Sequence, residues 1–237
     1  MKCVIRWHYQ MNGGFHMVKT MVLGANGGVG RYLVQLLKEN NQSFTAGVRK
    51  QEQKEALEAQ DIQAALIDVE HDSIETLQSQ FEGYDQVVFS VGSGGKTGAD
   101  QTLAVDLDGA VKAIKASEAA NVPHFVMVST WDSRREAIEE GGDLKPYTIA
   151  KHYADDYLRH SQLTATIVHP GGLTDEEGTA KVRIEALFDQ PKERKIARQD
   201  VARVLYEIVT QPENQGKEFQ VLNGNQDIQK ALLAYQS

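Results

Sequence analysis

Residues 21–41 read MVLGANGGVGRYLVQLLKENN, an apolar run, a glycine-rich loop and an amphipathic run in direct succession. Gly24, Gly27 and Gly30 follow one another at equal intervals within it. In a strand–loop–helix unit of this kind, the first glycine permits a tight turn and the second lets the backbone approach a diphosphate. The third lets the helix pack closely on the strand. A plain strand-to-helix turn is the alternative interpretation, and the place of the loop in the chain decides between the two.

The loop lies in the first unit of a chain in which apolar, β-branched runs alternate with segments of helical period. Strands are expected at 19–23, 43–48, 64–67, 86–91, 124–129, 164–169 and 218–222. Helices are expected at 28–40, 51–59, 74–81, 102–120, 146–160, 199–210 and 228–235. Such alternation is typical of an α/β protein with a parallel sheet and crossover helices. A triple glycine in the first unit of this pattern predicts nucleotide binding.

Length and composition narrow the class of protein. The 237 residues, with 41% hydrophobic and 24% charged residues, suit a single globular domain. A formal net charge of −8 argues against nucleic acid as a partner. No apolar stretch approaches the roughly 18 residues that span a bilayer, and Cys3 has no second cysteine to pair with. We therefore expect a cytoplasmic protein that binds a small-molecule substrate and neither nucleic acid nor membrane.

Residues 1–16, MKCVIRWHYQMNGGFH, show no clear period, and the ordered pattern begins at Met17. Asn12-Gly13-Gly14 can be encoded by a purine-rich, ribosome-binding sequence just upstream of a Met17 codon. Our hypothesis is that residues 1–16 are an N-terminal extension translated from a leader, followed by the nucleotide-binding domain at 17–237. A genuine arm that packs on the domain is the alternative.

The second expected strand runs into SFTAGVRKQEQK, residues 43–54, where Arg49 and Lys50 stand in place of an acid. A site that prefers NAD usually carries Asp or Glu about 20 residues after the glycine loop to hold the ribose 2′-hydroxyl. A guanidinium instead grips a 2′-phosphate through two parallel hydrogen bonds, which favours NADP(H) over NAD(H). A solvated charge pair that opens the next helix is the alternative. Asp68 and Val69, just past the third strand, are expected at the adenine edge.

A second glycine-rich loop, SVGSGGKTG, occupies residues 90–98. Its Gly-Lys-Thr matches the end of a P-loop, but Ser90 stands where that motif requires its first glycine, and the loop follows the wrong strand. We expect Ser90, Val91 and Gly92 near the ribose and nicotinamide instead. The cofactor contacts expected in the first loop are Gly24, Asn26, Gly27, Gly28, Val29 and Gly30.

Residues 143–158, DLKPYTIAKHYADDYL, place Tyr147 and Lys151 one helical turn apart on one face. Hydride delivery to a carbonyl needs an acid for the developing oxyanion, and a free phenol holds its proton up to about pH 10. An ammonium one turn away favours the phenolate, and Lys151 is also expected near the nicotinamide ribose. Ser129, at the end of the fifth strand, is expected to polarise the substrate oxygen. The alternative for Tyr147 is an ordinary residue on a helix face.

Together these motifs resemble those of short-chain dehydrogenases/reductases, in particular the atypical small bacterial NAD(P)-binding members near the NmrA-like, biliverdin-reductase-B-like and epimerase/dehydratase-like groups. The resemblance covers the chain from about residue 17 and rests on GANGGVG, VRK, VFSVGSGGKTG, VDLDGAVKAIKAS, FVMVST, PYTIAKHYADDYL, TIVHPGGLTDEEGT and ARQDVARVL. It implies a doubly wound Rossmann fold and chemistry with NADP(H). Two departures stand out. Asp106 replaces an asparagine that organises a proton-relay water in many members, and the interval from Ser129 to Tyr147 is long.

The resemblance also implies that Pro170, Gly171 and Gly172 form a turn beside the nicotinamide, and that residues 175–198 frame the substrate side. The charge-rich DQPKERKIARQD, residues 189–200, is typical of a solvated, mobile loop, which is the interpretation we favour there. The histidines show no spacing typical of metal ligands, so no metal is predicted.

The leading hypothesis is therefore an NADP(H)-dependent oxidoreductase that acts on a small carbonyl, quinone or flavin-like substrate. Tyr147 serves as the acid, Lys151 tunes it and Ser129 anchors the oxygen. A non-catalytic, NmrA-like sensor of NADP(H) is the first alternative, and a nucleotide-sugar epimerase or dehydratase is the second. The fold by itself does not choose among them. Either a monomer or a homodimer fits the sequence.

Overall fold

The computed structural model describes residues 8–11, 14–95, 97–140 and 142–235. Seven neighbouring strands of a nine-stranded sheet run parallel. In spatial order they are β12 (Glu218–Asn223), β8 (Thr164–Pro170), β7 (His124–Val128), β6 (Gln86–Phe89), β3 (Lys19–Leu23), β4 (Ser43–Val48) and β5 (Ala64–Leu66). The chain order reverses at β3, with β4 on one side and β6 on the other. This arrangement confirms the doubly wound Rossmann fold.

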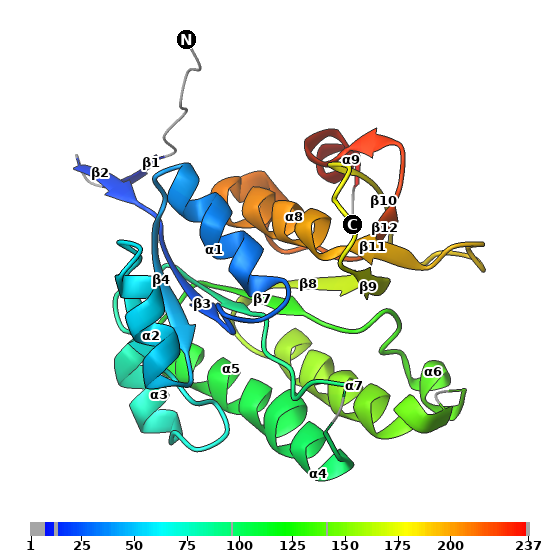
Figure 1. Cartoon of the computed structure of the whole chain (residues 1–237), viewed down its shortest axis with the longest axis horizontal. Coiled ribbons are helices and arrows are strands. Elements are labelled where there is room, and N and C mark those ends of the chain that lie inside the picture. The colour runs from blue at the N-terminus through cyan, green and yellow to red at the C-terminus, as the bar shows by residue number, and fades with distance from the viewer. Residues whose placement is uncertain (1–7, 12–13, 96, 141, 236–237) are drawn as a thin grey trace.

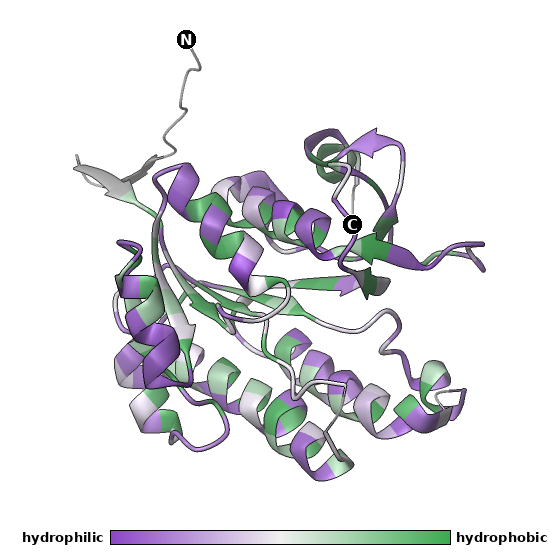
Figure 2. Cartoon of the chain, viewed as in Figure 1, coloured by the Kyte–Doolittle hydropathy of each residue, from purple (hydrophilic) through white to green (hydrophobic). Residues whose placement is uncertain are grey.

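Helices cover both faces of the sheet (Figure 1). One face packs against α1 (Gly30–Glu39), α8 (Arg198–Thr210) and α9 (Ile228–Ala234). The other packs against α3 (Ile74–Phe81), α5 (Ala110–Ala119) and α7 (Lys145–Arg159). Hydrophobic residues fill the strands between the two helix layers, and hydrophilic residues dominate the outer helix surfaces (Figure 2). Two buried clusters, one on each face, therefore form the core.

Local signals account for the helices that surround the site. In α1 the buried side chains of Leu33, Val34 and Leu37 recur at helical spacing, so one stripe faces the sheet. In α3 the side chain of Ser73 caps the first turn by accepting a 3.2 Å hydrogen bond from the Thr76 amide. α2 (Gln51–Glu58) contains no fully buried residue, and it packs next to β4 and β5.

The helix expected at 102–120 begins three residues earlier and consists of three successive elements. A short α4 (Ala99–Gln101) leads into a π-helical segment, η1 (Thr102–Gly109), and only then into α5. Bulges with π geometry are frequent at functional sites. A further short helix, α6 (Arg135–Glu139), lies in the polar stretch between Ser129 and Tyr147.

One edge of the sheet differs from the predicted parallel arrangement. There β10 (Lys181–Glu185) pairs antiparallel with β12, and β13 (Gln226–Asp227) pairs antiparallel with β10. Charged side chains along β10 suit a strand beside the sheet edge, where only the two-residue β13 follows, because they hinder further pairing. In the same region, the expected solvated loop at 189–200 is wrong for its second half. That half forms β11 (Lys195–Ala197) and the start of α8, with Ile196 fully buried.

At the N-terminal end, β1 (His8–Met11) and β2 (Gly14–Met17) form a two-stranded antiparallel hairpin that extends away from the sheet (Figure 1). The remainder of the expected extension, residues 1–7 and 12–13, lies outside the described residues. Within the described part of the chain, no helix has both the length and the hydropathy needed to cross a bilayer.

Candidate functional site

The glycine loop connects β3 to α1 at the carboxyl edge of the sheet. Gly24 has a φ of 77°, and a side chain there would collide with the carbonyl oxygen of Ser90 at the end of β6. A side chain at Gly30 would collide with the carbonyl oxygen of Gly24. Only glycine lets the loop lie this close to β6 and lets α1 start this close to β3. The backbone thus forms the cradle that the sequence predicts.

The same loop presents amide donors with no partner. The amides of Gly28, Val29 and Gly30 donate to no acceptor among the described residues. They lie at the N-terminus of α1, which has no side-chain cap and no acidic residue in its first turn. Free amides at the positive end of a helix dipole favour an anion. The cradle therefore fits the diphosphate of a dinucleotide.

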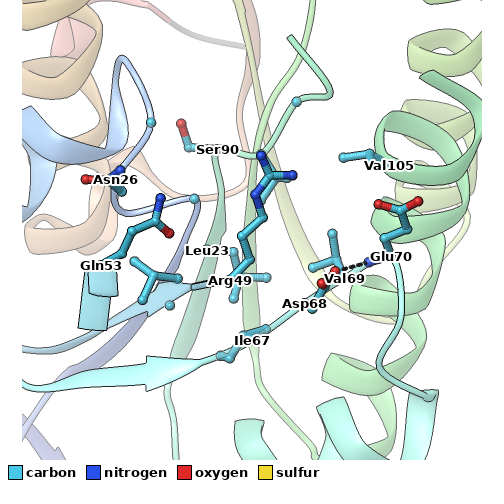
Figure 3. A pocket seen from close by; sticks show the side chains of 16 residues that line it. Leu23, Asn26, Arg49, Gln53, Ile67, Asp68, Val69, Glu70, Ser90 and Val105 are labelled. Carbon is cyan, nitrogen blue, oxygen red and sulfur yellow. Dashed lines mark hydrogen bonds between the residues drawn. The ribbon is translucent and has the colours of Figure 1, made fainter. Parts of the chain in front are cut away.

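A cavity of about 290 Å³ adjoins the cradle (Figure 3). It includes the sequence-predicted residues Gly24, Asn26, Gly27, Arg49, Asp68, Val69, Ser90, Val91 and Gly92. Gln53, Glu70 and Val105 also line the cavity, and the sequence motifs did not predict this. Gln53 lies one turn into α2 and Val105 lies in η1, so no motif marks either of them. Glu70 is within two residues of Asp68, and that proximity is the signal that could have identified it.

Arg49 follows β4 and projects into the middle of this cavity (Figure 3). It forms no ion pair or hydrogen bond with any other residue in the described ranges. Lys50, the residue before α2, is exposed and does not line the cavity. The structure therefore brings Arg49 to the cavity and leaves Lys50 outside it.

Asp68 lies on the other side of the cavity from Arg49, and its carboxylate contacts residues that follow it closely in the sequence (Figure 3). Its carboxylate accepts a 3.0 Å hydrogen bond from the Glu70 amide and lies 3.1 Å from Nδ1 of His71. Burial opposes ionisation, but these two contacts hold the pKa of Asp68 below its usual 3.8. Asp68, Glu70 and His71 place their ligand atoms within 4.8 Å of one another, yet exposed acidic groups often cluster without an ion, and we assign none.

The second glycine-rich loop is held by η1. The buried carboxylate of Asp106 accepts a 3.1 Å hydrogen bond from the Ser93 amide. A side chain at Gly92 would lie 3.3 Å from the other oxygen of Asp106. Asp106 thus acts on the backbone of the loop beside Ser90 and Gly92.

The three expected catalytic residues lie where α7 meets the end of β7. Tyr147 is half-buried in the first turn of α7. Lys151, one turn later, is only 1% exposed, and its Nζ donates a 3.0 Å hydrogen bond to the Val128 carbonyl. Ser129 is 4% exposed, and its Oγ donates to a carboxylate oxygen of Asp155. The structure brings the Lys151 ammonium to the Val128 carbonyl, which directly precedes Ser129 in the chain, but none of the three lines the cavity.

Pro170 is the last residue of β8, and Gly171 and Gly172 follow it at the same edge of the sheet. The Gly171 amide donates to the Val221 carbonyl at 3.1 Å, and the Gly172 amide donates to the Arg194 carbonyl at 2.6 Å. Gly172 then begins β9 (Gly172–Thr174), which pairs parallel with β11. Pro170, Gly171 and Gly172 are thus fixed to the C-terminal part of the chain, outside the cavity lining.

A second cavity, of about 240 Å³, lies beside α7, and His169 of β8 and Glu218 of β12 line it. Nε2 of His169 is 2.9 Å from Glu218, which also binds Arg159. Although burial favours the neutral imidazole, the hydrogen bond to Glu218 and the charge of Asp155 raise the pKa of His169 above 6.5. Burial opposes ionisation of Glu218, but hydrogen bonds from Arg159 and His169 lower its pKa to about 2.

Comparison with known proteins agrees with this geometry. YhfK of Bacillus subtilis, named an uncharacterized sugar epimerase, is 42% identical over 217 residues, which cover 91% of this chain and 99% of YhfK. A solved structure from Bacillus halodurans, provisionally named an NAD-dependent epimerase/dehydratase, has a TM-score of 0.84 at 38% identity and covers 92% of this chain and 100% of its own. The oxidoreductase ylbE from Lactococcus lactis has a TM-score of 0.79 at 33% identity and covers 92% of this chain and 96% of its own. The NAD(P)H-binding family matches residues 24–212. The chain therefore belongs to the NAD(P)H-binding family, with the Rossmann fold implied by its resemblance to the atypical short-chain dehydrogenases/reductases.

Proposed function

We propose that the protein is an NADP(H)-dependent oxidoreductase that acts on a small carbonyl, quinone or flavin-like substrate. The observation that carries the proposal is the cavity beside the glycine cradle, into which Arg49 projects without a protein partner in the described ranges. A guanidinium in that place suits the 2′-phosphate that distinguishes NADP(H). The similarity to the oxidoreductase ylbE supports the reaction class. A cytoplasmic location and a monomer or homodimer complete the proposal.

In this proposal the bound cofactor would supply a hydride for reduction or accept one in the reverse direction, and Tyr147 on α7 would correspondingly donate or accept the proton. Tyr147 moves a proton at its phenolic oxygen, and Lys151 supports it from one turn further along the helix. The hydrogen bond from Nζ to the Val128 carbonyl fixes Lys151 against β7. Ser129 polarises the substrate oxygen once its hydroxyl turns away from Asp155. Pro170, Gly171 and Gly172 border the nicotinamide end.

The test is a screen of NADPH oxidation over quinones, flavins and aldehydes with the purified full chain. Turnover is expected with at least one substrate class, and Tyr147→Phe should lower kcat at least about tenfold, as loss of a general acid does. Tyr153→Phe is the matched control, because Tyr153 lies on the same helix and is 47% exposed. Equal effects of the two substitutions would remove Tyr147 from the mechanism. Tight NADPH binding without any turnover would favour the NADP(H) sensor.

A second candidate is a nucleotide-sugar epimerase or dehydratase, favoured by the names of YhfK and the Bacillus halodurans protein. Such an enzyme takes a hydride from the sugar and returns it to the oxidised intermediate, so the reaction consumes no net cofactor. Incubation with a panel of nucleotide sugars, followed by chromatography, separates this candidate from the first. Sugar interconversion without net change in cofactor absorbance is the result expected of an epimerase.

A further inference from the structure

Arg198, the first residue of α8, lies directly on the glycine cradle. A Cβ atom built at Gly28 would lie 2.7 Å from Nε of Arg198. The Arg198 side chain therefore lies against the loop backbone at this glycine. Gly28 is also the first of the three residues whose amides donate to no described acceptor. A fixed cation therefore adjoins the donors that favour an anion, although the two are separated by 170 positions in the sequence.

Strand pairing fixes this position. β9 and β11 pair in parallel, with Thr174 opposite Ala197. Asp175 directly follows β9 and Arg198 directly follows β11, so the two side chains lie next to each other. Nη1 of Arg198 lies 3.0 Å from Oδ1 of Asp175. The same oxygen lies 3.8 Å from Nη2 of Arg31 in the first turn of α1.

Asp175 is the exposed member of this cluster. Its side chain is 73% exposed, against 25% for Arg198, and within the described ranges its ion pairs are those with the two guanidinium groups. The loop that carries it is anchored elsewhere. The amides of Thr179 and Ala180 donate to the fully buried carboxylate of Asp200 at 2.8 and 2.9 Å. Loss of the Asp175 contact therefore leaves the loop attached to α8.

We propose that Arg198 binds the diphosphate of the dinucleotide together with the amides of the glycine loop, and that Asp175 competes with the diphosphate for this guanidinium. Two cations against one carboxylate leave the cluster net positive, which suits an anion. A guanidinium binds a phosphate group through parallel hydrogen bonds, and the ion pair of Nη1 with Asp175 makes that nitrogen less available to a phosphate, so the two acceptors compete. The inference rests on dinucleotide binding, but it concerns a part of the ligand that NADPH and NADH share.

The test measures Kd by calorimetry for NADPH, NADH and 2′-AMP, which lacks the diphosphate. Arg198→Gln should weaken both dinucleotides about tenfold, as loss of a charged hydrogen bond does. Its affinity for 2′-AMP should stay within about twofold of wild type. Lys195→Gln is the matched control, since it removes an exposed positive charge from the same segment without touching Gly28. Thermal unfolding of each variant without ligand reports any loss of folding.

Asp175→Asn provides an independent arm that does not require Arg198 to be altered. It should tighten both dinucleotides by about threefold, and this gain should vanish in the Arg198→Gln background, because the two residues act on one interaction. Inorganic pyrophosphate should compete with NADH more weakly in Arg198→Gln than in wild type. Wild-type affinity for both dinucleotides in Arg198→Gln, or an equal loss for 2′-AMP, overturns the inference and leaves the proposed function intact. Absence of dinucleotide binding to the wild-type protein overturns both.

Discussion

Among single residues, Arg49 is the one on which the proposed preference for NADP(H) over NAD(H) depends. Its neighbour Lys54 pairs with Glu58 along α2 at 3.6 Å, whereas Arg49 has no partner in the described ranges. The charged groups of Lys54 and Arg49 thus differ in their availability to a ligand, although both residues follow β4 closely in the sequence. A ligand phosphate meets at Arg49 a guanidinium that does not have to leave a protein carboxylate.

We expect Arg49→Ala to raise the Kd of NADPH about tenfold or more and to change that of NADH by less than about threefold, because only NADPH carries the 2′-phosphate. Fluorescence titration with each reduced cofactor measures the two values. Lys50→Ala is the control, since Lys50 does not line the cavity and should leave both values unchanged. An equal loss for NADPH and NADH contradicts the cofactor preference.

At the scale of elements, η1 determines how the second glycine-rich loop meets the cavity. Its wider π-helical turn includes Asp106, whose buried carboxylate holds the Ser93 amide. Val105, from the same turn, lines the cavity itself. A single element therefore supplies both a wall of the cavity and the anchor of the loop that borders it.

Asp106→Ala should weaken NADPH binding about tenfold, because the Ser93 amide loses its acceptor and the loop at 92–95 gains freedom. Asp106→Asn keeps an oxygen acceptor in the same place and should bind within about threefold of wild type. Calorimetry gives the affinities, and amide hydrogen exchange is expected to rise at 92–95 only in the alanine variant. If Asn and Ala behave alike, the hydrogen bond to Ser93 is not what positions the loop.

Across the whole molecule, a buried polar layer links the sheet to α8. His124 of β7 lies 3.0 Å from Oε1 of Gln86 and 2.9 Å from Oγ1 of Thr166. The amide group of Gln86 donates to Thr20 of β3 at 2.7 Å and to the Val209 carbonyl of α8 at 2.8 Å. With Gln86 Oε1 as acceptor, Nδ1 of His124 carries the proton and the imidazole is neutral. Burial lowers the pKa of His124 to about 4.

Because the pKa of His124 is about 4 in the folded chain and 6.5 in model compounds, the unfolded chain binds more protons between these values. The stability due to His124 is fully present above pH 6.5 and is lost as the pH falls towards 4, by about 3 kcal/mol at most. Thermal unfolding across this range should show a steeper acid loss in wild type than in His124→Gln. His169→Gln should retain the acid loss, because the raised pKa of His169 gives a contribution that disappears as the pH rises. Parallel curves for wild type and His124→Gln contradict this account.

The sequence by itself determined the alternating strands and helices, the central parallel strands and the glycine cradle. These features are local, because period, β-branching and glycine spacing act over a few residues. The residues predicted at the ends of β3, β4 and β6 also meet in one cavity, since parallel strands bring their carboxyl ends to one edge.

Only the tertiary structure decided the antiparallel edge strands, the π-helical turn, the bond between Ser129 and Asp155, and the position of Arg198 on Gly28. Each depends on segments far apart in the chain, so no local pattern encodes it. By its charged sequence alone, β10 is typical of a loop, and it forms a strand because it pairs with β12. By sequence alone, Arg198 is typical of a surface residue, and it reaches the glycine loop because β9 and β11 pair. The physical reason is that strand pairing and close packing depend on contacts between segments that are distant in the sequence. Secondary-structure propensity and hydrophobic period, in contrast, depend only on the residues of one segment.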